Sequence, residues 1–187
     1  MLSTYFAEGL PYSIAHKVAS EFFTAAGASL QVIGLTSFFG IPWNLKFLWS
    51  PLVDMVGTPR RWLLLTQLAV GLATAALAWP AARGALGLAA GGFLLLAAIA
   101  ATHDIAIDGF YLYALDKKSQ AAHSGLRVTA YRVALAKGGI LVALAGWTSW
   151  PVAFLTGGAA LGLLAAVHAL ILPRPRRVSE PHPVAEV

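Results

Sequence analysis

Three long stretches of this chain contain no Asp, Glu, Lys or Arg, and they constrain its fold more than any other feature. They cover residues 62–79, 84–102 and 138–172. About 20 apolar residues in a helix cross the hydrocarbon core of a bilayer, so the first two are one span long and the last holds two. Only 11% of all residues are charged, against roughly 25% in an average globular protein. The sequence therefore predicts an integral membrane protein.

We predict an all-α, polytopic membrane protein with six transmembrane helices. The expected spans are residues 3–24, 30–53, 62–80, 85–114, 123–145 and 151–172. The last two are joined by a tight turn over residues 146–151, which contains Gly and Pro and is flanked by interfacial Trp residues. Residues 1–172 thus form one six-helix transmembrane bundle. Residues 173–187 hold several Pro and Arg and are expected to form a flexible cytoplasmic linker.

Basic residues are distributed unequally between the two sides of this predicted bundle. Only Arg83 lies in the loops of one side, and the other side carries Arg60, Arg61, Lys117, Lys118, Arg127, Arg174, Arg176 and Arg177. By the positive-inside rule, both termini are cytoplasmic. Because the net charge of +5 is divided among short loops, a nucleic-acid-binding surface is not expected.

The first span contains more ionisable side chains than a lipid-facing helix tolerates. Glu8, His16, Lys17 and Glu21 all lie within or near it. A charge at membrane depth persists where it is paired, lines a watery cavity or takes part in transport. Lys17 and Glu21 are four residues apart, so they form either a simple pair on one helix face or part of the polar wall of a substrate cavity.

Four further charges in the fourth and fifth spans are expected to pair. If these spans form an antiparallel hairpin centred near residue 119 or 120, Asp108 lies opposite Arg132 and Asp104 lies opposite Lys137. We favour the first pair, because Arg132 and Lys137 diverge around their helix. The pairs are either structural or part of a proton pathway, and the same two interpretations apply to Lys46, deep in the second span.

Other kinds of chemistry are not indicated. The chain has no cysteine, which excludes thiolate metal sites and cysteine nucleophiles. The histidines lack the spacing of metal ligands, so neither a metal nor another cofactor is expected. His103 and Asp104 are neighbours in one helix and point to different faces, unlike members of a catalytic triad. We predict that the chain is not an enzyme; an intramembrane hydrolase using Asp104 and Asp108 is the less favoured alternative.

Four segments together resemble one transporter family. They are residues 9–11 (GLP), 33–35 (IGL), 40–54 (GIPWNLKFLWSPLVD) and 101–108 (ATHDIAID). In these strings the chain is similar to the AmpG-type muropeptide permeases, which form one branch of the major facilitator superfamily with the acetyl-CoA transporters. The resemblance covers most of residues 5–150 and implies the N-terminal half of a major facilitator fold.

That resemblance implies a proton-driven carrier that works by alternating access, with its site near the bilayer midplane between two six-helix halves. In the superfamily the first and fourth helices line the cavity, which favours Glu8, Lys17, Glu21, His103 and Asp104 as cavity residues. The full set of candidates for the substrate cavity or proton coupling is Glu8, Lys17, Glu21, Lys46, His103, Asp104, Asp108, Arg132 and Lys137. Asp54, Gly57, Arg60 and Arg61 lie where the superfamily carries its gating loop.

The expected function is secondary active transport: proton-coupled uptake of a muropeptide-like or related metabolite across the bacterial inner membrane. The expected partners are the small-molecule substrate, protons, the lipid bilayer, and either a missing C-terminal six-helix half or a second copy of the chain. A stand-alone six-helix half-carrier or membrane scaffold is the alternative.

Overall fold

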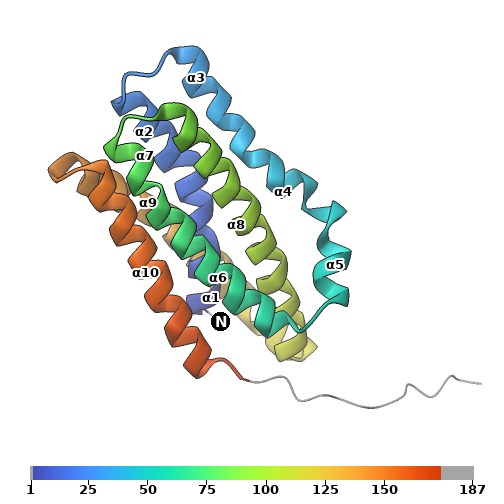
Figure 1. The fold of residues 1–187 in the computed structure, drawn as a ribbon. Coiled ribbons are helices and arrows are strands. Elements are labelled where there is room, and N and C mark those ends of the chain that lie inside the picture. Colours follow the sequence, from blue (N-terminus) through green and yellow to red (C-terminus); the bar gives the residue numbers. More distant parts are fainter. Residues whose placement is uncertain (1, 174–187) are drawn as a thin grey trace, which may run out of the picture.

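A computed structural model describes residues 2–173, and all regular structure within them is helical (Figure 1). The elements are α1 (Leu2–Ser13), a π-helical turn (Ile14–Val18), α2 (Ala19–Ala25), α3 (Leu30–Leu35), a 3₁₀ turn (Thr36–Gly40), α4 (Ile41–Leu45), a second 3₁₀ turn (Lys46–Leu48), α5 (Ser50–Met55), α6 (Pro59–Ala76), α7 (Ala78–Ala82), α8 (Leu86–Ala114), α9 (Lys117–Trp147) and α10 (Trp150–Ile171). The predicted all-α class is confirmed. Residues 174–187 of the predicted linker lie outside the described residues.

Four helical stretches within residues 2–173 are long and apolar enough to cross a membrane. They are Pro59–Ala82, Leu86–Ala114, Lys117–Trp147 and Trp150–Ile171, and they correspond to the last four expected spans. Their ends differ from the expected ones because of local capping. The Thr58 side chain accepts a hydrogen bond at the start of α6, and the Asp116 side chain does the same for α9, which begins six residues before the expected 123.

The first two expected spans are helical but interrupted. Residues 2–25 pass through the π-helical turn, and residues 30–55 are divided among α3, α4 and α5 by the two 3₁₀ turns. Pro42 and Pro51 each lie in the first turn of a new helix, where their missing N–H is tolerated. The six-span topology stays a prediction, because neither segment is an uninterrupted helix of membrane length.

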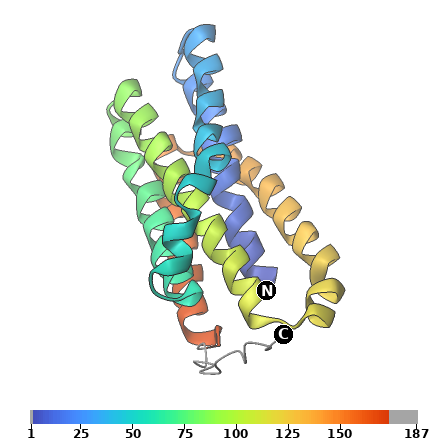
Figure 2. The same cartoon turned by 90° about the vertical axis from the view of Figure 1, so that its right-hand side faces the viewer.

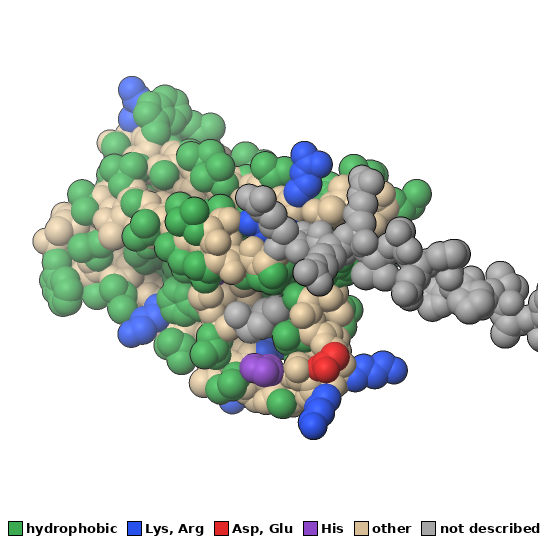
Figure 3. Space-filling model, turned by 90° about the horizontal axis from the view of Figure 1, so that it is seen from below, with side chains coloured by type: hydrophobic (Ala, Val, Ile, Leu, Met, Phe, Trp, Pro, Cys, Tyr) green, Lys and Arg blue, Asp and Glu red, His purple; other side chains and the backbone are tan. Residues whose placement is uncertain are grey.

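The long helices form a bundle in which α1 is central. α1 packs against both α8 and α9, and α6 packs against α8 and α10. α8 and α9 diverge from their short connection, while α3, α4 and α5 follow the outer side of α8 (Figure 2). Figure 3, which views the molecule from below, shows Lys and Arg side chains scattered among hydrophobic ones, with an acidic and a His side chain at one edge.

Aromatic rings fill the core where α2, α8 and α10 meet. Phe93 lies 5.9 Å from Phe22 and 5.8 Å from Phe154 between ring centroids, and it stacks on Phe39 at 5.7 Å. All four rings are buried. Each such pair contributes about 0.5–1.5 kcal/mol beyond area burial, so this cluster ties the interrupted segments to the long helices.

Two glycines let α6 and α10 approach backbone to backbone. A Cβ atom on Gly158 would lie 2.6 Å from the carbonyl oxygen of Gly71, and one on Gly71 would lie 3.1 Å from that of Gly158. In lipid, where burial of apolar surface does not drive helices together, small residues at such crossings allow close van der Waals packing.

Candidate functional site

Lys46 and Asp104 form an ion pair in the interior of the described chain. Lys46 lies in the second 3₁₀ turn, and Asp104 lies in the middle of α8. The Asp104 side chain is 11% exposed and the Lys46 side chain 33%. A second contact joins the same two segments, because the Trp49 indole N–H donates to Thr102 Oγ1 at 3.1 Å. The interrupted segment 30–55 is therefore held to α8 by polar contacts as well as by packing.

Glu8 of α1 completes this group. Its carboxyl group lies close enough to that of Asp104 to interact with it. The second oxygen of Glu8, Oε2, is buried without a hydrogen-bond partner. The three side chains thus bring two carboxyl groups next to one cation.

A second ion pair lies one helical turn further along α8. Arg127 of α9 contacts Asp108 Oδ1 through Nη2 at 2.8 Å, and the Tyr5 hydroxyl donates to the same oxygen at 3.2 Å. The Arg127 guanidinium lies 4.5 Å from the centroid of the Tyr5 ring and 5.3 Å from that of Tyr111. Asp108 and Arg127 are each 38% exposed, so this pair borders an open space.

That space is a cavity of about 320 Å³ between α1 and α9. Its polar lining consists of Tyr5, Glu8, Arg127, Tyr131 and Arg132, and two aliphatic side chains complete it. Its volume is at the lower end of the range of about 300–1,000 Å³ that is usual for small-molecule sites. Because Glu8 both lines the cavity and interacts with Asp104, the cavity is adjacent to the group formed by Glu8, Lys46 and Asp104.

An aromatic group borders the same region. The Tyr12 ring stacks on His16 at 4.1 Å between centroids and contacts Trp43 edge-on at 4.9 Å. Tyr131, in the cavity wall, lies 6.2 Å from Tyr12. Gly40 permits this arrangement, since a Cβ there would lie 3.0 Å from His16 Nε2. Flat aromatic faces next to charged groups suit an amphipathic ligand.

Comparison with known proteins places the chain in a family. Residues 1–90 match the family model of acetyl-coenzyme A transporter 1. The anhydromuropeptide permease of Escherichia coli K12 is 32% identical over 152 residues, which are 78% of this chain and 31% of the permease. An uncharacterized protein of Haemophilus influenzae is 31% identical over 158 residues, 81% of this chain and 37% of that protein. An uncharacterized membrane protein of Saccharomyces cerevisiae is 29% identical over 147 residues.

The chain belongs to the branch of the major facilitator superfamily that contains the AmpG-type permeases and the acetyl-CoA transporters. The resemblance expected from the sequence is confirmed, as is the expectation that the chain is not an enzyme, because the matching family model is that of a transporter and the named relative is a permease. Its apolar helices and its relatives make it an integral membrane protein. The chain spans about a third of the length of the bacterial relatives, 37% and 31%.

The expected pairs of Asp108 with Arg132 and of Asp104 with Lys137 do not form in this AmpG-type chain. Asp108 pairs with Arg127 and Asp104 with Lys46. The expectation assumed that α8 and α9 lie side by side as a hairpin, but α1 packs against both and the two helices diverge (Figure 2). Arg132 is exposed at the cavity wall, and Lys137 is exposed elsewhere on α9.

The other cavity candidates of this AmpG-type chain lie apart from the site. Lys17 and Glu21 are exposed, and they do not form either of the two ion pairs found among residues 2–173. His103 is buried on the opposite face of α8, where its Nδ1 lies 2.9 Å from Thr66 Oγ1. Of the nine candidates, the structure brings together Glu8, Lys46 and Asp104, with Asp108 and Arg132 close by.

The gating-loop candidates lie at the end of α5 (Asp54), in the turn that follows it (Gly57) and in the first turn of α6 (Arg60 and Arg61). Gly57 adopts a φ of +82°, which favours glycine, and Asp54 is exposed. The Arg60 guanidinium donates to the carbonyl oxygens of Leu172 at 3.2 Å and Ala169 at 2.6 Å. Arg60 therefore caps the C-terminus of α10 within this chain. The Arg61 side chain borders a surface cavity of about 240 Å³.

Sequence reasoning missed Arg127, Tyr5 and the aromatic group of this AmpG-type site. By sequence alone, Arg127 belongs with the basic residues at the ends of the expected spans, and so it was not treated as a residue of the site. A usable signal was present in α1, because Tyr5, Glu8 and Tyr12 are three and four residues apart and share one helix face. Polar and aromatic side chains at that spacing in an apolar segment indicate a face turned away from lipid.

Proposed function

We propose that this chain forms one wall of the transport cavity of a proton-coupled carrier. The observation that supports this most directly is the contact of Glu8 with Asp104 beside Lys46. Charged groups at membrane depth are costly, at least ~2.5–3.5 kcal/mol on insertion scales, and they mark ion and proton pathways. Here they lie next to a cavity, which gives a bound proton a route to substrate.

In the proposed cycle, a proton from outside the cell binds to the Glu8–Asp104 pair. With one carboxyl protonated, the remaining negative charge is balanced by Lys46. When the carrier opens to the cytoplasm, the proton leaves. Lys46 alone then compensates the negative charge of the two carboxylates, and this state favours the return of the carrier to its outward-open form. Lys46 belongs to the interrupted segment 30–55, so a change in the helical geometry of that segment alters the distance between the cation and Asp104.

The chemistry of the cavity suits an amphipathic anion. Arg127 and Arg132 offer guanidinium groups that bind carboxylates in a bidentate manner, and Tyr12, Trp43 and Tyr131 offer faces for a sugar ring or an apolar group. A relative is an anhydromuropeptide permease by name. We therefore propose a muropeptide-like sugar-peptide, or a related metabolite, as the substrate that is carried inward.

We also propose that a second six-helix unit completes the carrier. Either a C-terminal half or a second copy of the chain would cover the cavity, since the superfamily fold is built from two such repeats. In this proposal all six segments span the bacterial inner membrane, with both termini in the cytoplasm, because the basic residues gather at the α5–α6 and α8–α9 turns.

Uptake into proteoliposomes tests the proposal. The complete gene product that contains this chain is reconstituted, and entry of radiolabelled anhydromuropeptide is followed with and without an imposed inward proton gradient. Glu8→Gln and Asp104→Asn are expected to abolish the stimulation by the gradient, a loss of about tenfold or more, while exchange of labelled for unlabelled substrate continues.

The matched control is Asp116→Asn, the same chemical change outside the bilayer at a position where Asn also caps a helix. It should leave uptake unchanged. Gradient-driven uptake at the wild-type rate in both cavity variants would show that these carboxyl groups do not couple protons to transport.

A further inference from the structure

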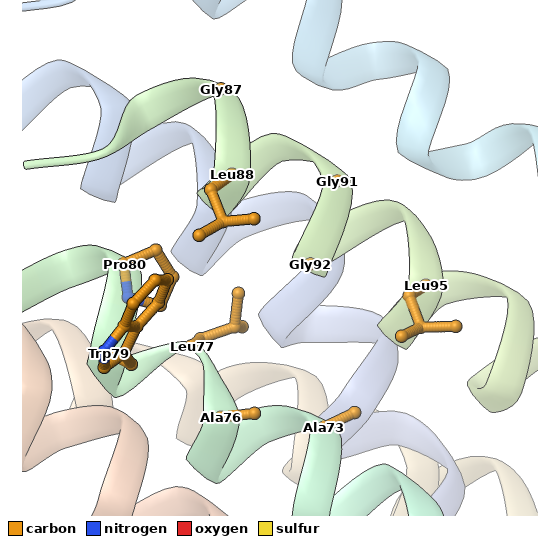
Figure 4. Close-up of a pocket in the computed structure, with 10 residues that line it drawn as sticks. All are labelled: Ala73, Ala76, Leu77, Trp79, Pro80, Gly87, Leu88, Gly91, Gly92 and Leu95. Carbon is orange, nitrogen blue, oxygen red and sulfur yellow. The ribbon is translucent and has the colours of Figure 1, made fainter.

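A second cavity lies on the outer face of the bundle, away from the charged site. It is a groove of about 400 Å³ between the end of α6, α7 and the first half of α8 (Figure 4). All its lining residues are apolar or glycine. Trp79, Leu88 and Leu95 stand at its edges and are 51–59% exposed. In a bilayer this groove faces lipid, so the acyl chains of lipids can fill it.

Glycines on α8 keep the groove open. A Cβ atom on Gly87 or Gly91 would meet no atom within 4 Å, so the missing side chains are not needed for packing inside this chain. Gly92 differs, since its Cβ would lie 2.8 Å from Leu77 Cδ2, where α6 approaches α8. Gly92 brings the helices together, whereas Gly87 and Gly91, one helical turn apart, leave a channel beside the contact.

A cation lies at one end of this channel. The Arg83 guanidinium is held 4.3 Å from the centroid of the Trp79 ring, and it follows α7 directly in the chain. No acidic residue occurs between Asp54 and Asp104, and Arg83 takes part in neither ion pair found within residues 2–173. Trp and Arg at the end of an apolar helix are typical of the membrane interface, where phosphate groups lie.

We infer that this groove is a binding site for an anionic glycerophospholipid, with one acyl chain along Gly87 and Gly91 and the phosphate group at Arg83. The apolar lining selects for a hydrocarbon chain, and the unpaired cation selects for a negative headgroup. A helix of another protein would fill the groove without needing a positive charge at its end. The site is separate from the Glu8 cavity, so the inference does not depend on the proposed transport function.

Native mass spectrometry of the purified chain in detergent tests this inference. The probes are phosphatidylglycerol and phosphatidylcholine with the same palmitoyl and oleoyl chains. The wild-type chain is expected to retain phosphatidylglycerol about fivefold better than phosphatidylcholine, because one Arg contributes at the headgroup. Arg83→Gln should remove this preference, and Gly91→Leu should reduce binding of both lipids.

Two matched controls accompany these variants. Gly146→Leu places the same side chain on α9, where a Cβ likewise meets no atom within 4 Å, and Lys118→Gln removes an exposed charge at the other end of the bundle. Both should bind lipid as the wild type does. Because Arg83 is exposed, we expect Arg83→Gln to fold. The test of headgroup preference therefore stays informative even if Gly91→Leu fails to fold.

Three outcomes would overturn the inference. Equal retention of both lipids by the wild type would exclude headgroup selection by Arg83. Unchanged lipid retention by a folded Gly91→Leu would exclude the groove as the place of binding. A wild-type dimer that dissociates in Gly91→Leu would assign the groove to contact between copies of the chain.

Discussion

Lys46 and Asp104 form an ion pair although they are 58 residues apart in the sequence. The pair links a 3₁₀ turn, where the regular α-helical backbone is already interrupted, to the middle of α8, an apolar helix of 29 residues. Glu8 contacts the same carboxylate from α1. The charged side chains of three segments, α1, the second 3₁₀ turn and α8, therefore meet in one small polar group, where the cation balances negative charge.

Removing one member of this pair should cost more than removing both. Lys46→Met leaves Asp104 without its cation in a mostly buried position and is expected to lower the free energy of unfolding by about 1–3 kcal/mol. The double variant Lys46→Met with Asp104→Asn should recover part of this loss. Unfolding in mixed micelles at increasing SDS concentration measures both. A loss in the double variant equal to the sum of the losses in Lys46→Met and Asp104→Asn would mean that the two side chains are not energetically coupled.

Adding a single methyl group at Gly158 should separate α6 from α10. Its Cβ would lie 2.6 Å from the Gly71 carbonyl oxygen, so Gly158→Ala is expected to destabilise the fold by about 1–3 kcal/mol. Gly162→Ala is the control, since a Cβ at that position on the same helix meets nothing within 4 Å. The same SDS titration compares them. A Gly158→Ala chain as stable as Gly162→Ala would contradict the close crossing.

Arg60 should protect the last turn of α10. Its two hydrogen bonds to the Ala169 and Leu172 carbonyl oxygens use the fixed fork of a guanidinium group, which Lys cannot reproduce. In Arg60→Lys we expect hydrogen exchange at the amides of Leu170 to Leu172 to accelerate about two- to tenfold, as the loss of roughly 0.5–1.5 kcal/mol implies. Arg61→Gln alters an exposed side chain and should leave these amides unchanged. Similar exchange in both variants would rule out the cap.

Asp116 should make the start of α9 sensitive to acid. Hydrogen bonds from the Ser119 side chain and backbone N–H hold the pKa of Asp116 below its ordinary value of 3.8. A carboxylate with a lowered folded-state pKa stabilises the helix start above about pH 5, and this contribution disappears as pH falls through that pKa. Hydrogen exchange at the Ser119 amide, followed from pH 6 to pH 3, should show this loss of protection. Asp116→Asn keeps a capping side chain but has no carboxyl group to titrate. If hydrogen exchange at the Ser119 amide depends on pH in this variant as it does in the wild type, Asp116 is not the cause of the loss of protection.

The sequence allowed much of the fold to be predicted, because hydrophobic length is a local property. The expected spans locate the four long helices to within about six residues at each end, and Thr58 and Asp116 explain the differences at two of those ends. The interruption of residues 30–55 was less evident. Proline disfavours the interior of a helix, so Pro42 and Pro51 are compatible with the interruption, but where α-helix changes to 3₁₀ depends on packing against α8.

Predicting the partners of the charged residues required the order of the helices in space. Glu8, Lys46, Asp104 and Asp108 stand out in the sequence as charges in apolar segments. Which of them meet depends on α1 packing between neighbours that are far away in the chain, and no local pattern specifies this. The pairing of Asp108 with Arg132 failed for that reason, since Arg127 reaches the same carboxylate from a position more than one turn earlier on α9.

The close crossing at Gly71 and Gly158 also has a mechanical consequence. Because their backbones are in contact, α6 and α10 have little room to slide or tilt against each other, and they act as one rigid unit. Shape changes of the bundle then concentrate in the π-helical turn after α1 and in the 3₁₀ turns of residues 30–55, where the regular hydrogen-bond ladder is already broken. The chain thus divides into a rigid part and a flexible part: the ammonium group of Lys46 belongs to a segment that can bend, and the carboxyl group of Glu8 lies in α1, just before the π-helical turn.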